Sequence, residues 1–246
     1  MQNAIFNAAQ TKSGIIRWIQ NYFEKNGADS KAVIGISGGK DSSIAAALCV
    51  EALGASRVFG VLMPNGGQKD IDFSLELAGL LGIDLVVIDI KDSVEAVFTG
   101  LTKSKLELNN QAAVNTPARI RMTVLYAVSA IVGGRVVNTC NLSEDYVGYS
   151  TKYGDSAGDF SPLSKLTVTE VRAVGRELLP AKFVDKVPED GLSGLTDEDN
   201  MGFSYDVLDK YIREGICDSA SVKEKIDRLH ITNKHKLEPM PSYDKT

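Results

Sequence analysis

The 246-residue chain has few cysteines, no excess of basic residues and no long apolar segment, and each shortage excludes a class of protein. The cysteines are odd in number and widely spaced, which argues against a disulfide framework and against a metal cluster: Cys49, Cys140 and Cys217. We expect them to be buried thiols in a reducing cytoplasm. No apolar run reaches the length of a membrane span, and the first residues lack the basic-then-apolar pattern of a signal peptide.

The charge balance limits the possible partners. A formal net charge of −5, with no basic stripe among aromatic residues, argues against nucleic-acid binding. A polyanionic ligand must therefore be held by local positive groups, because the field of the whole molecule is unfavourable. With 43% hydrophobic and 24% charged residues, the composition is that of an ordinary globular protein that can bury a sizeable core.

Strand-like and helix-like segments alternate through the first 90 residues. The pattern predicts strands at 33–37, 58–63 and 84–90, with helices at 42–53 and 72–81 between them. This alternation is typical of βαβ units and a parallel sheet. In such sheets ligands bind beyond the carboxyl ends of the strands, where Ser37–Ser43 and Pro64–Gly67 fall.

The sequence predicts that the rest of the chain is mostly helical. The expected elements are helices 3–26, 92–108, 116–131, 166–179, 206–214 and 221–234, a strand at 135–140, a loop at 143–162 and a mobile segment at 185–204. The first helix has an apolar stripe that includes Trp18 and Phe23. The helix at 116–131, with Pro117 at its start, is apolar nearly all round, so it must be buried on more than one side. We expect it to lie in the core and to pack against a second subunit.

The most informative segment follows the first predicted strand. An apolar run is followed there by hydroxyl, glycine, lysine and carboxylate side chains and then by an alanine-rich helix: Gly35, Ile36, Ser37, Gly38, Gly39, Lys40, Asp41, Ser42 and Ser43. Glycines let the backbone turn tightly, and the helix start presents unpaired N–H groups and the positive end of its dipole. The order predicts an anion-binding cup, and Asp41 beside it suggests a metal ion between carboxylate and phosphate.

This cup differs from the two commoner nucleotide-binding loops, because it has neither the Gly-x-x-x-x-Gly-Lys-Ser/Thr spacing nor Gly-x-Gly-x-x-Gly. It resembles instead the Ser-Gly-Gly-x-Asp-Ser loop of the ATP pyrophosphatases, which split ATP between its α and β phosphates and form an adenylylated intermediate. The plainer interpretation is a glycine turn with Ser42 or Ser43 as the helix cap. The lysine, the aspartate and the hydroxyls together favour the phosphate loop.

Further motifs resemble those of one family within this group, the NAD synthetases. The matching segments follow one another in the expected order: Ala118-Arg119-Ile120-Arg121-Met122, Thr139 with Ser143-Glu144, Thr151-Lys152-Tyr153-Gly154-Asp155, Asp159 with Pro162, Thr196-Asp197-Glu198, Gly202 with Tyr205, and His235-Lys236. The resemblance implies a Rossmann-like three-layer α/β fold, with a twisted parallel sheet flanked by helices. It implies one domain over residues 1–246 with no glutaminase domain, which matches the ammonia-dependent form.

The resemblance also implies the reaction. ATP would convert the carboxylate of deamido-NAD to an acyl adenylate with release of pyrophosphate, and ammonia would then displace AMP to give NAD. The implied partners are ATP, deamido-NAD, ammonia, Mg²⁺ and a second copy of the chain, with the dinucleotide near the interface between the copies.

The same resemblance assigns roles to residues. Mg²⁺ would be held by Asp41 and Glu144. ATP would be held by Gly35 to Ser42 with Thr139, Lys165 and Glu189. Deamido-NAD would contact Arg119, Lys152, Asp159, His235 and Lys236. The catalytic set would be Lys40, Asp41 and Asp155, with Asp155 binding ammonium and taking its proton.

The chain departs from the family pattern at a few positions, and two other functions stay open. The departures are Val168 in place of an ATP-contacting lysine with Lys165 nearby, Glu189 in place of a hydroxyl residue, and Asn138 and Cys140 in place of glycine and aspartate around Thr139. One alternative is another ATP-pyrophosphatase amidotransferase or thiolase, similar to GMP synthetase or a tRNA-thiolating enzyme. The other is a nucleotide-binding sensor that has lost catalysis.

Overall fold

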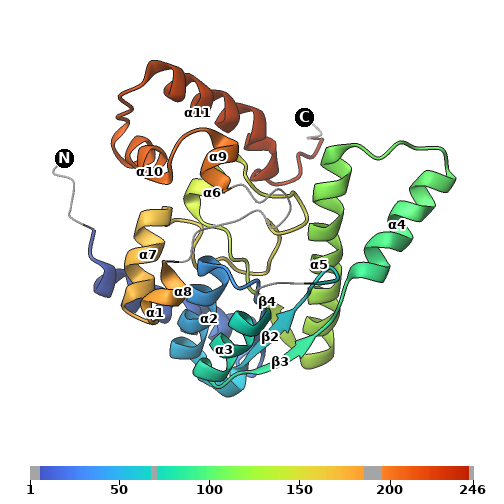
Figure 1. Ribbon diagram of the computed structural model, residues 1–246. Coiled ribbons are helices and arrows are strands. Elements are labelled where there is room, and N and C mark those ends of the chain that lie inside the picture. The colour runs from blue at the N-terminus through green and yellow to red at the C-terminus, as the bar shows by residue number, and fades with distance from the viewer. Residues whose placement is uncertain (1–5, 68–70, 186–195, 244–246) are drawn as a thin grey trace.

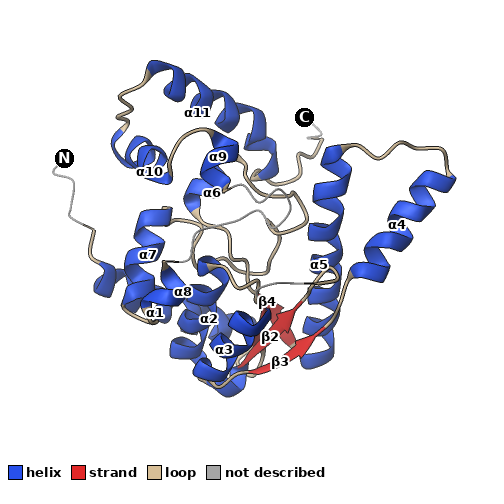
Figure 2. Ribbon diagram, viewed as in Figure 1, coloured by secondary structure: helices blue, strands red, loops and turns tan. Residues whose placement is uncertain are grey.

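A parallel sheet forms the centre of the protein, which the computed structural model describes at residues 6–67, 71–185 and 196–243 (Figures 1 and 2). Its order is β3-β2-β1-β4, with bounds β1 (Lys31–Gly35), β2 (Val58–Leu62), β3 (Asp84–Val87) and β4 (Gly134–Val136). Ala32 of β1 lies opposite Val58 on one side and Arg135 on the other. The chain runs outward from β1 to β3 and then returns to add β4 beside β1. The strand order therefore reverses between β1 and β4, where open α/β sheets bind ligands.

Helices cover both faces of the sheet and its carboxyl edge (Figure 1). Their bounds are α1 (Ala8–Asn26), α2 (Lys40–Leu53), α3 (Ile71–Leu81), α4 (Lys91–Lys103), α5 (Asn110–Val132), α6 (Leu142–Val147), α7 (Val168–Arg176), α8 (Ala181–Val184), α9 (Asp197–Met201), α10 (Tyr205–Glu214) and α11 (Ala220–Asn233), with short 3₁₀ turns η1 (Ala55–Arg57) and η2 (Lys234–Lys236). None of the described helices combines the length and the hydrophobicity of a membrane span.

Side chains alternate across the sheet and so build two apolar layers. Ala32 and Ile34 of β1 belong to a cluster with residues of α1, α2, α3 and α7, whereas Val33 belongs to a cluster with α4 and α5. Successive strand residues point to opposite faces, so a continuous apolar run is what a strand buried on both faces requires. The three-layer arrangement follows from this.

A third apolar cluster lies over the carboxyl edge of the sheet. It joins α9, α10 and α11, here called the C-terminal lobe, to α6 and to the start of α7, through Val147, Val168, Met201, Tyr205, Leu208 and Ile226 among others. Figure 1 shows this lobe above α2 and α7 and beside the upper end of α5. The lobe thus covers the edge at which the loop after β1 emerges.

The structure confirms the parallel α/β sheet but corrects several local expectations. The expected loop at 143–162 contains α6, because Asn141 and Glu144 form a reciprocal capping box at its start. Pro117 lies inside α5, since Asn109 caps that helix eight residues earlier. Trp18 is 45% exposed and lies off the buried stripe, whereas Phe23 is buried.

Other boundaries also differ from the prediction. The strands expected at 84–90 and 135–140 end at Val87 and Val136, and the helix expected at 92–108 ends at Lys103. Residues 1–5 and 186–195 lie outside the described residues, so most of the segment expected to be mobile is not compared, and its end contains α9. Of the three free thiols, Cys217 is only partly buried, contrary to expectation.

We predict that Gly175→Ala destabilises the protein. A methyl group at Gly175 would lie 2.5 Å from Ile44 Cδ1, where α7 packs against α2. Overpacking of this kind costs about 1–3 kcal/mol. The control is Gly100→Ala on α4, where nothing lies within 4 Å of the added methyl; it removes backbone freedom and should stabilise by roughly 0.5–1 kcal/mol. Urea unfolding measures both, and equal stabilities for the two variants would contradict the packing argument.

Candidate active site

The loop between β1 and α2 forms a cup of backbone and hydroxyl groups. Gly38 has φ of 83°, a left-handed conformation that favours glycine. Gly39 is the N-cap of α2 and has no side-chain cap, which leaves the helix start available to an anion. The hydroxyls of Ser37 and Ser42 lie 3.1 Å apart, and Ser42 and Ser43 donate back to the Gly39 carbonyl at 3.1 and 2.8 Å. Ser42 and Ser43 therefore do not cap the helix.

Lys40 lies at the first position of α2 with its side chain buried. Its Nζ is 2.7 Å from Asp41 Oδ2. Burial lowers the pKa of Lys40, but the charges of Asp41 and Glu144 raise it by more, so the net effect is a raised pKa. The ammonium group therefore stays charged beside the cup, as a phosphate-binding group must.

Asp41 and Glu144 come from different elements, and the carboxylates of both accept hydrogen bonds from one residue, Asn141. Asn141 donates through Nδ2 to Asp41 Oδ1 at 3.2 Å, and its backbone N–H donates to Glu144 Oε2 at 3.4 Å. Asn141 Oδ1 accepts from the Glu144 N–H at 3.1 Å, which completes the cap of α6. The two carboxylates thus approach each other across the point where the strand order reverses, and their joint role as metal ligands stays a prediction.

The carboxylate pair fits Mg²⁺. Burial, followed by the charge of Asp41, raises the pKa of Glu144 well above its ordinary value, so a cation between the two groups would be strongly favoured. Among the described residues no group of three or more His, Cys, Asp or Glu side chains is placed to hold a metal. Mg²⁺ is commonly coordinated by two carboxylates, with phosphate oxygens and water as its other ligands.

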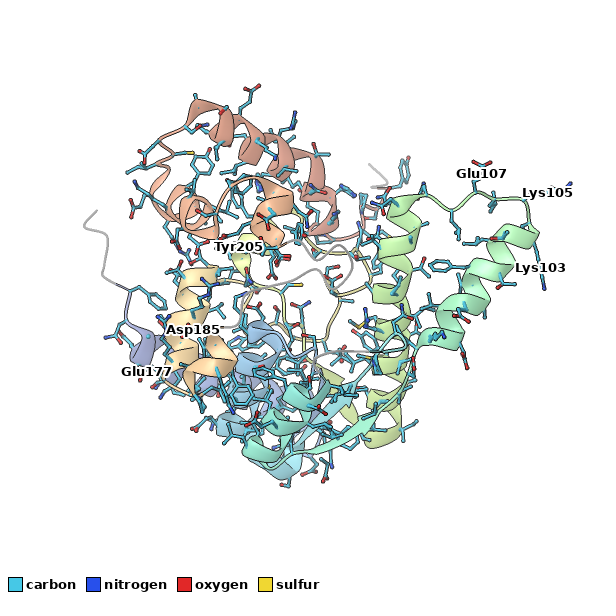
Figure 3. The ribbon with its side chains drawn as sticks, in the orientation of Figure 1. Lys103, Lys105, Glu107, Glu177, Asp185 and Tyr205 are labelled. Atoms are coloured by element: carbon cyan, nitrogen blue, oxygen red, sulfur yellow. The ribbon has the colours of Figure 1, made fainter. Side chains whose placement is uncertain are left out.

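A tyrosine and an aspartate of the C-terminal lobe lie against this site. The Tyr205 hydroxyl donates to Asp197 Oδ2 at 3.1 Å, and Lys40 Nζ lies 5.8 Å from the centre of the Tyr205 ring. Burial raises the pKa of Asp197, and the hydroxyls of Tyr205 and Tyr149 oppose that shift. Figure 3 shows Tyr205 at the junction between the lobe and the helices below it. The lobe is therefore tied to the phosphate loop through an aromatic face over Lys40.

A second cluster gathers most of the residues predicted to hold the nucleotide substrate. Arg119 Nε on α5 donates to the Lys152 carbonyl at 3.2 Å, and Lys152 Nζ donates to the His235 carbonyl at 2.6 Å. Lys236 Nζ donates to the Gly148 carbonyl at 2.7 Å. The middle of α5, the loop after α6 and η2 therefore meet, and they bring together cations that are more than 100 positions apart in the sequence.

Asp155 lies between the two clusters. Its backbone carbonyl accepts from Asn138 Nδ2 at 2.9 Å, on the segment that follows β4, and its carboxylate accepts from the Thr151 N–H at 2.8 Å. The side chain is open to solvent, yet the surrounding protein raises its pKa against the effects of Thr151 and Lys236. Desolvation by the surrounding protein is the largest cause of this shift, and the raised pKa makes Asp155 a stronger base than an ordinary aspartate.

Asp159 does not join these clusters. Its Oδ2 accepts from the Val136 N–H at 2.7 Å, and its Oδ1 accepts from the Tyr126 hydroxyl at 3.4 Å. Tyr126 lies about two turns beyond Arg119 on α5. Asp159 thus closes the end of β4, and its predicted contact with the nucleotide substrate stays a prediction.

The remaining ATP-binding candidates are only partly placed. Thr139 lies on the segment between β4 and α6, close to Asn138 and Cys140 in the chain. Lys165 is exposed, its charge acts on Asp145, and its carbonyl accepts from Arg213. Glu189 lies outside the described residues. These ATP contacts stay predictions.

Several residues of the site have no role predicted from the sequence: Asn141, Asp197, Tyr205 and Arg121. Asn141 has a local signal, because Asn-x-x-Glu is a capping-box pattern. Asp197 and Tyr205 were noted only as family motifs. Arg121 lies partly buried with Nε donating to the Met63 carbonyl at 3.0 Å, and burial lowers its pKa while Asp155 raises it. Their contacts with the site arise from tertiary packing.

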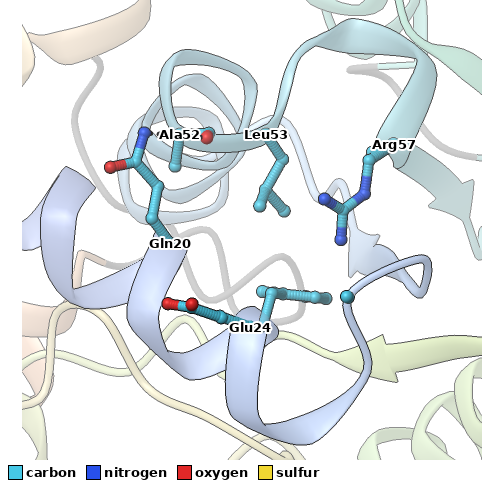
Figure 4. Close-up of a pocket in the computed structure, with 7 residues that line it drawn as sticks. Gln20, Glu24, Ala52, Leu53 and Arg57 are labelled. Atoms are coloured by element: carbon cyan, nitrogen blue, oxygen red, sulfur yellow. Dashed lines mark hydrogen bonds between the residues drawn. The ribbon is translucent and has the colours of Figure 1, made fainter.

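A hollow of about 200 Å³ lies elsewhere in the protein (Figure 4). It is lined by residues of α1, the end of α2 and η1, including Gln20, Leu53 and Arg57. This end of α2 is about 18 Å along the helix from the phosphate loop. Arg57 already donates to the Ser30 carbonyl at 2.8 Å, and Gln20 donates to the Ala52 carbonyl at 3.1 Å. The hollow carries none of the chemistry described above.

Comparison with known proteins identifies the family. The family described as NAD synthase matches residues 12–241. The chain belongs to the NAD synthase family. The NH(3)-dependent NAD(+) synthetase of Pyrococcus furiosus is 37% identical over 229 residues, which cover 87% of this chain and 88% of that protein.

Two solved structures support this membership. An NMN synthetase from Francisella tularensis matches with a TM-score of 0.88 and 33% identity, covering 97% of this chain and 99% of that one. An NH3-dependent NAD synthetase from Campylobacter jejuni matches with a TM-score of 0.78 and 28% identity, covering 98% and 100%. The Rossmann-like α/β fold is therefore confirmed.

We predict that Asn141→Ser lowers activity without lowering stability. Serine caps a helix about as well as asparagine, so α6 keeps its cap, but the donor to Asp41 is lost. Asn141→Ala loses both contacts and should also cost about 1 kcal/mol of stability. Thermal unfolding and the Mg²⁺ dependence of turnover measure the two effects. Full activity of Asn141→Ser at limiting Mg²⁺ would contradict the assigned role of Asn141.

Proposed function

We propose that the chain, acting as one domain, is an ammonia-dependent NAD synthetase that uses ATP to convert the carboxylate of deamido-NAD to an amide. The observation that carries this proposal is the pairing of the two clusters. A phosphate cup with Lys40 and the Asp41–Glu144 pair lies on one side, a basic cluster for a second nucleotide lies on the other, and Asp155 lies between them. Family membership supports the same reaction.

The first step would activate the substrate carboxylate. A carboxylate oxygen attacks the α phosphorus of ATP, the bond to the β phosphate breaks, and pyrophosphate leaves with the electron pair. The loop from Gly35 to Ser42 and the charged Lys40 would bind the phosphate chain, because fixed N–H donors and a buried ammonium group stabilise the charge that develops there. Asp41 and Glu144 would hold Mg²⁺, which supplies further stabilisation of phosphate charge.

The second step would form the amide. Ammonium bound at Asp155 would lose a proton to the carboxylate, and the resulting ammonia would attack the acyl carbon. The bond from that carbon to the AMP oxygen would break with its electron pair on AMP, and the nitrogen would lose a second proton to solvent to give the amide. The raised pKa of Asp155 suits a group that accepts this proton. Arg119, Lys152 and Lys236 would bind the nucleotide substrate, because they exchange bonds to neutral carbonyls for bonds to phosphate.

A second candidate substrate is nicotinate mononucleotide, with nicotinamide mononucleotide as the product. The structural likeness to the Francisella tularensis NMN synthetase, at a TM-score of 0.88, exceeds that to the Campylobacter jejuni NAD synthetase, at 0.78. Both substrates present the same carboxylate, so the activation and amidation chemistry would be unchanged. The substrates differ only in the adenylate portion.

We predict that ATP, Mg²⁺, ammonium and deamido-NAD give NAD, AMP and pyrophosphate, and that glutamine does not replace ammonium. Chromatography of the nucleotide products, run in parallel with nicotinate mononucleotide, measures kcat/KM for each substrate. A larger value for the mononucleotide would assign the second candidate. Formation of ADP and orthophosphate, or a requirement for glutamine, would contradict both.

We also propose that the active form is a homodimer that pairs along α5. This helix buries Leu125 and Val128 in its own subunit, but Ile131 is 83% exposed and Tyr126 is also exposed. Ala127 and Ala130, which lie between them, are exposed as well. An apolar outer face on a helix that already covers a sheet is suited to contact with a second copy.

Light scattering tests the dimer. We expect twice the chain mass of 26.5 kDa for the wild type and the single-chain mass for Ile131→Glu, because a carboxylate cannot be buried unpaired. Leu80→Glu, at a residue 54% exposed on α3, is the matched control and should leave the mass unchanged. A wild-type mass of 26.5 kDa at assay concentration would exclude the dimer.

A further inference from the structure

Arg172 on α7 has a buried nitrogen without a partner. Three side-chain atoms in the described part of the chain are buried and lack a hydrogen bond: Ser74 Oγ, Ser150 Oγ and Arg172 Nε. Of these, only Arg172 belongs to a group with a permanent charge. A buried N–H of a cation that lacks an acceptor is costly, so its presence calls for an explanation.

Other arginines near α7 have partners. Arg176, one turn further along, donates to Asp185 Oδ1 at 2.8 Å, and Arg213 pairs with Glu170. Among the described residues no hydrogen bond or ion pair satisfies Arg172. Glu170, the carboxylate on α7, therefore does not accept a hydrogen bond from Arg172 Nε.

Packing places Arg172 beside the phosphate loop. Gly175 brings α7 close to Ile44 on α2, and Arg172 lies about one helical turn before Gly175. Lys40 begins α2, one turn before Ile44. Arg172 is close enough that its charge lowers the pKa of Lys40, although Asp41 and Glu144 outweigh it. Two cations thus approach the same region from two helices.

Another cation close to α7 in the chain, Lys165, is predicted to contact ATP, and that contact stays a prediction. The charge of Lys165 acts on Asp145, and its side chain is exposed. Val168, one turn before Arg172 on the same face of α7, is fully buried in the apolar cluster of the C-terminal lobe. Arg172 is the remaining group on α7 that can supply a positive charge beside Lys40.

We propose that Arg172 binds the β and γ phosphates of ATP together with Lys40, and that it holds the pyrophosphate after cleavage. This inference rests on the proposed function. A phosphate oxygen supplies the acceptor that the buried Nε lacks, and the planar guanidinium matches phosphate geometry. Bound nucleotide thereby joins α7 to α2 across the cup.

Calorimetry with MgATP, MgPPi and AMP tests the assignment on the full chain. Arg172→Met should weaken MgATP and MgPPi by about tenfold to hundredfold, since a charge-assisted contact is lost, and should leave AMP binding nearly unchanged. Arg172→Lys should recover part of the loss, because the charge is kept and the fork is not. Arg176→Met, on the same helix but paired with Asp185, is the control and should bind all three probes like the wild type.

Stability separates ligand binding from a structural role. Without ligand, Arg172→Met should melt at or above the wild-type temperature, because an unsatisfied buried donor has been removed. A lower melting temperature together with equal loss of AMP binding would assign Arg172 to packing and overturn the inference. If Arg172→Met binds MgPPi as tightly as the wild type does, the inference about Arg172 is wrong and the proposed function is unaffected. If the wild-type protein binds neither MgATP nor MgPPi, both the inference and the proposed function are wrong.

Discussion

The site depends on two carboxylates of like charge being held close together. Asp41 follows β1 and Glu144 follows β4, so they approach from the two sides of the point where the strand order reverses. Burial, and then the charge of Asp41, raise the pKa of Glu144, whereas the backbone N–H of Asn141 opposes that shift and its side chain bonds to Asp41. Lys40 adds a positive charge on the same side. A cation placed between the two carboxylates would relieve their repulsion.

The C-terminal lobe also packs against the phosphate loop and the two carboxylates. The ring of Tyr205 lies beside the Lys40 ammonium group, and its hydroxyl donates to Asp197. The lobe therefore contacts the phosphate loop through an aromatic face and not through another exposed charge. Asp209 reinforces the contact by accepting from Ser143 and Thr169, at 2.5 Å from the Ser143 hydroxyl. Ser143 precedes Glu144, so the same buried carboxylate also supports the helix that carries Glu144.

The sequence predicted those parts of the site that are encoded locally. The order of strand, glycines, lysine and helix start describes the phosphate cup by itself, because every contact within it spans only a few residues. The bond between Asn141 and Asp41 joins positions 100 apart, and no local pattern reports it. The prediction of a loop at 143–162 was wrong for a different reason. Its glycine and serine content outweighed a capping box that starts a helix of only six residues.

The bonds made by Lys152 and Lys236 have a consequence for how the protein meets its ligand. Both ammonium groups end on backbone carbonyls and not on carboxylates. Among the described residues neither lysine is paired directly with a carboxylate, although Asp155 is near enough to Lys236 to act on its pKa. An approaching anion would therefore be attracted at long range and could replace a carbonyl without separating an ion pair. An anion that bound here would displace two neutral carbonyl dipoles and would not have to displace a carboxylate bonded to either lysine.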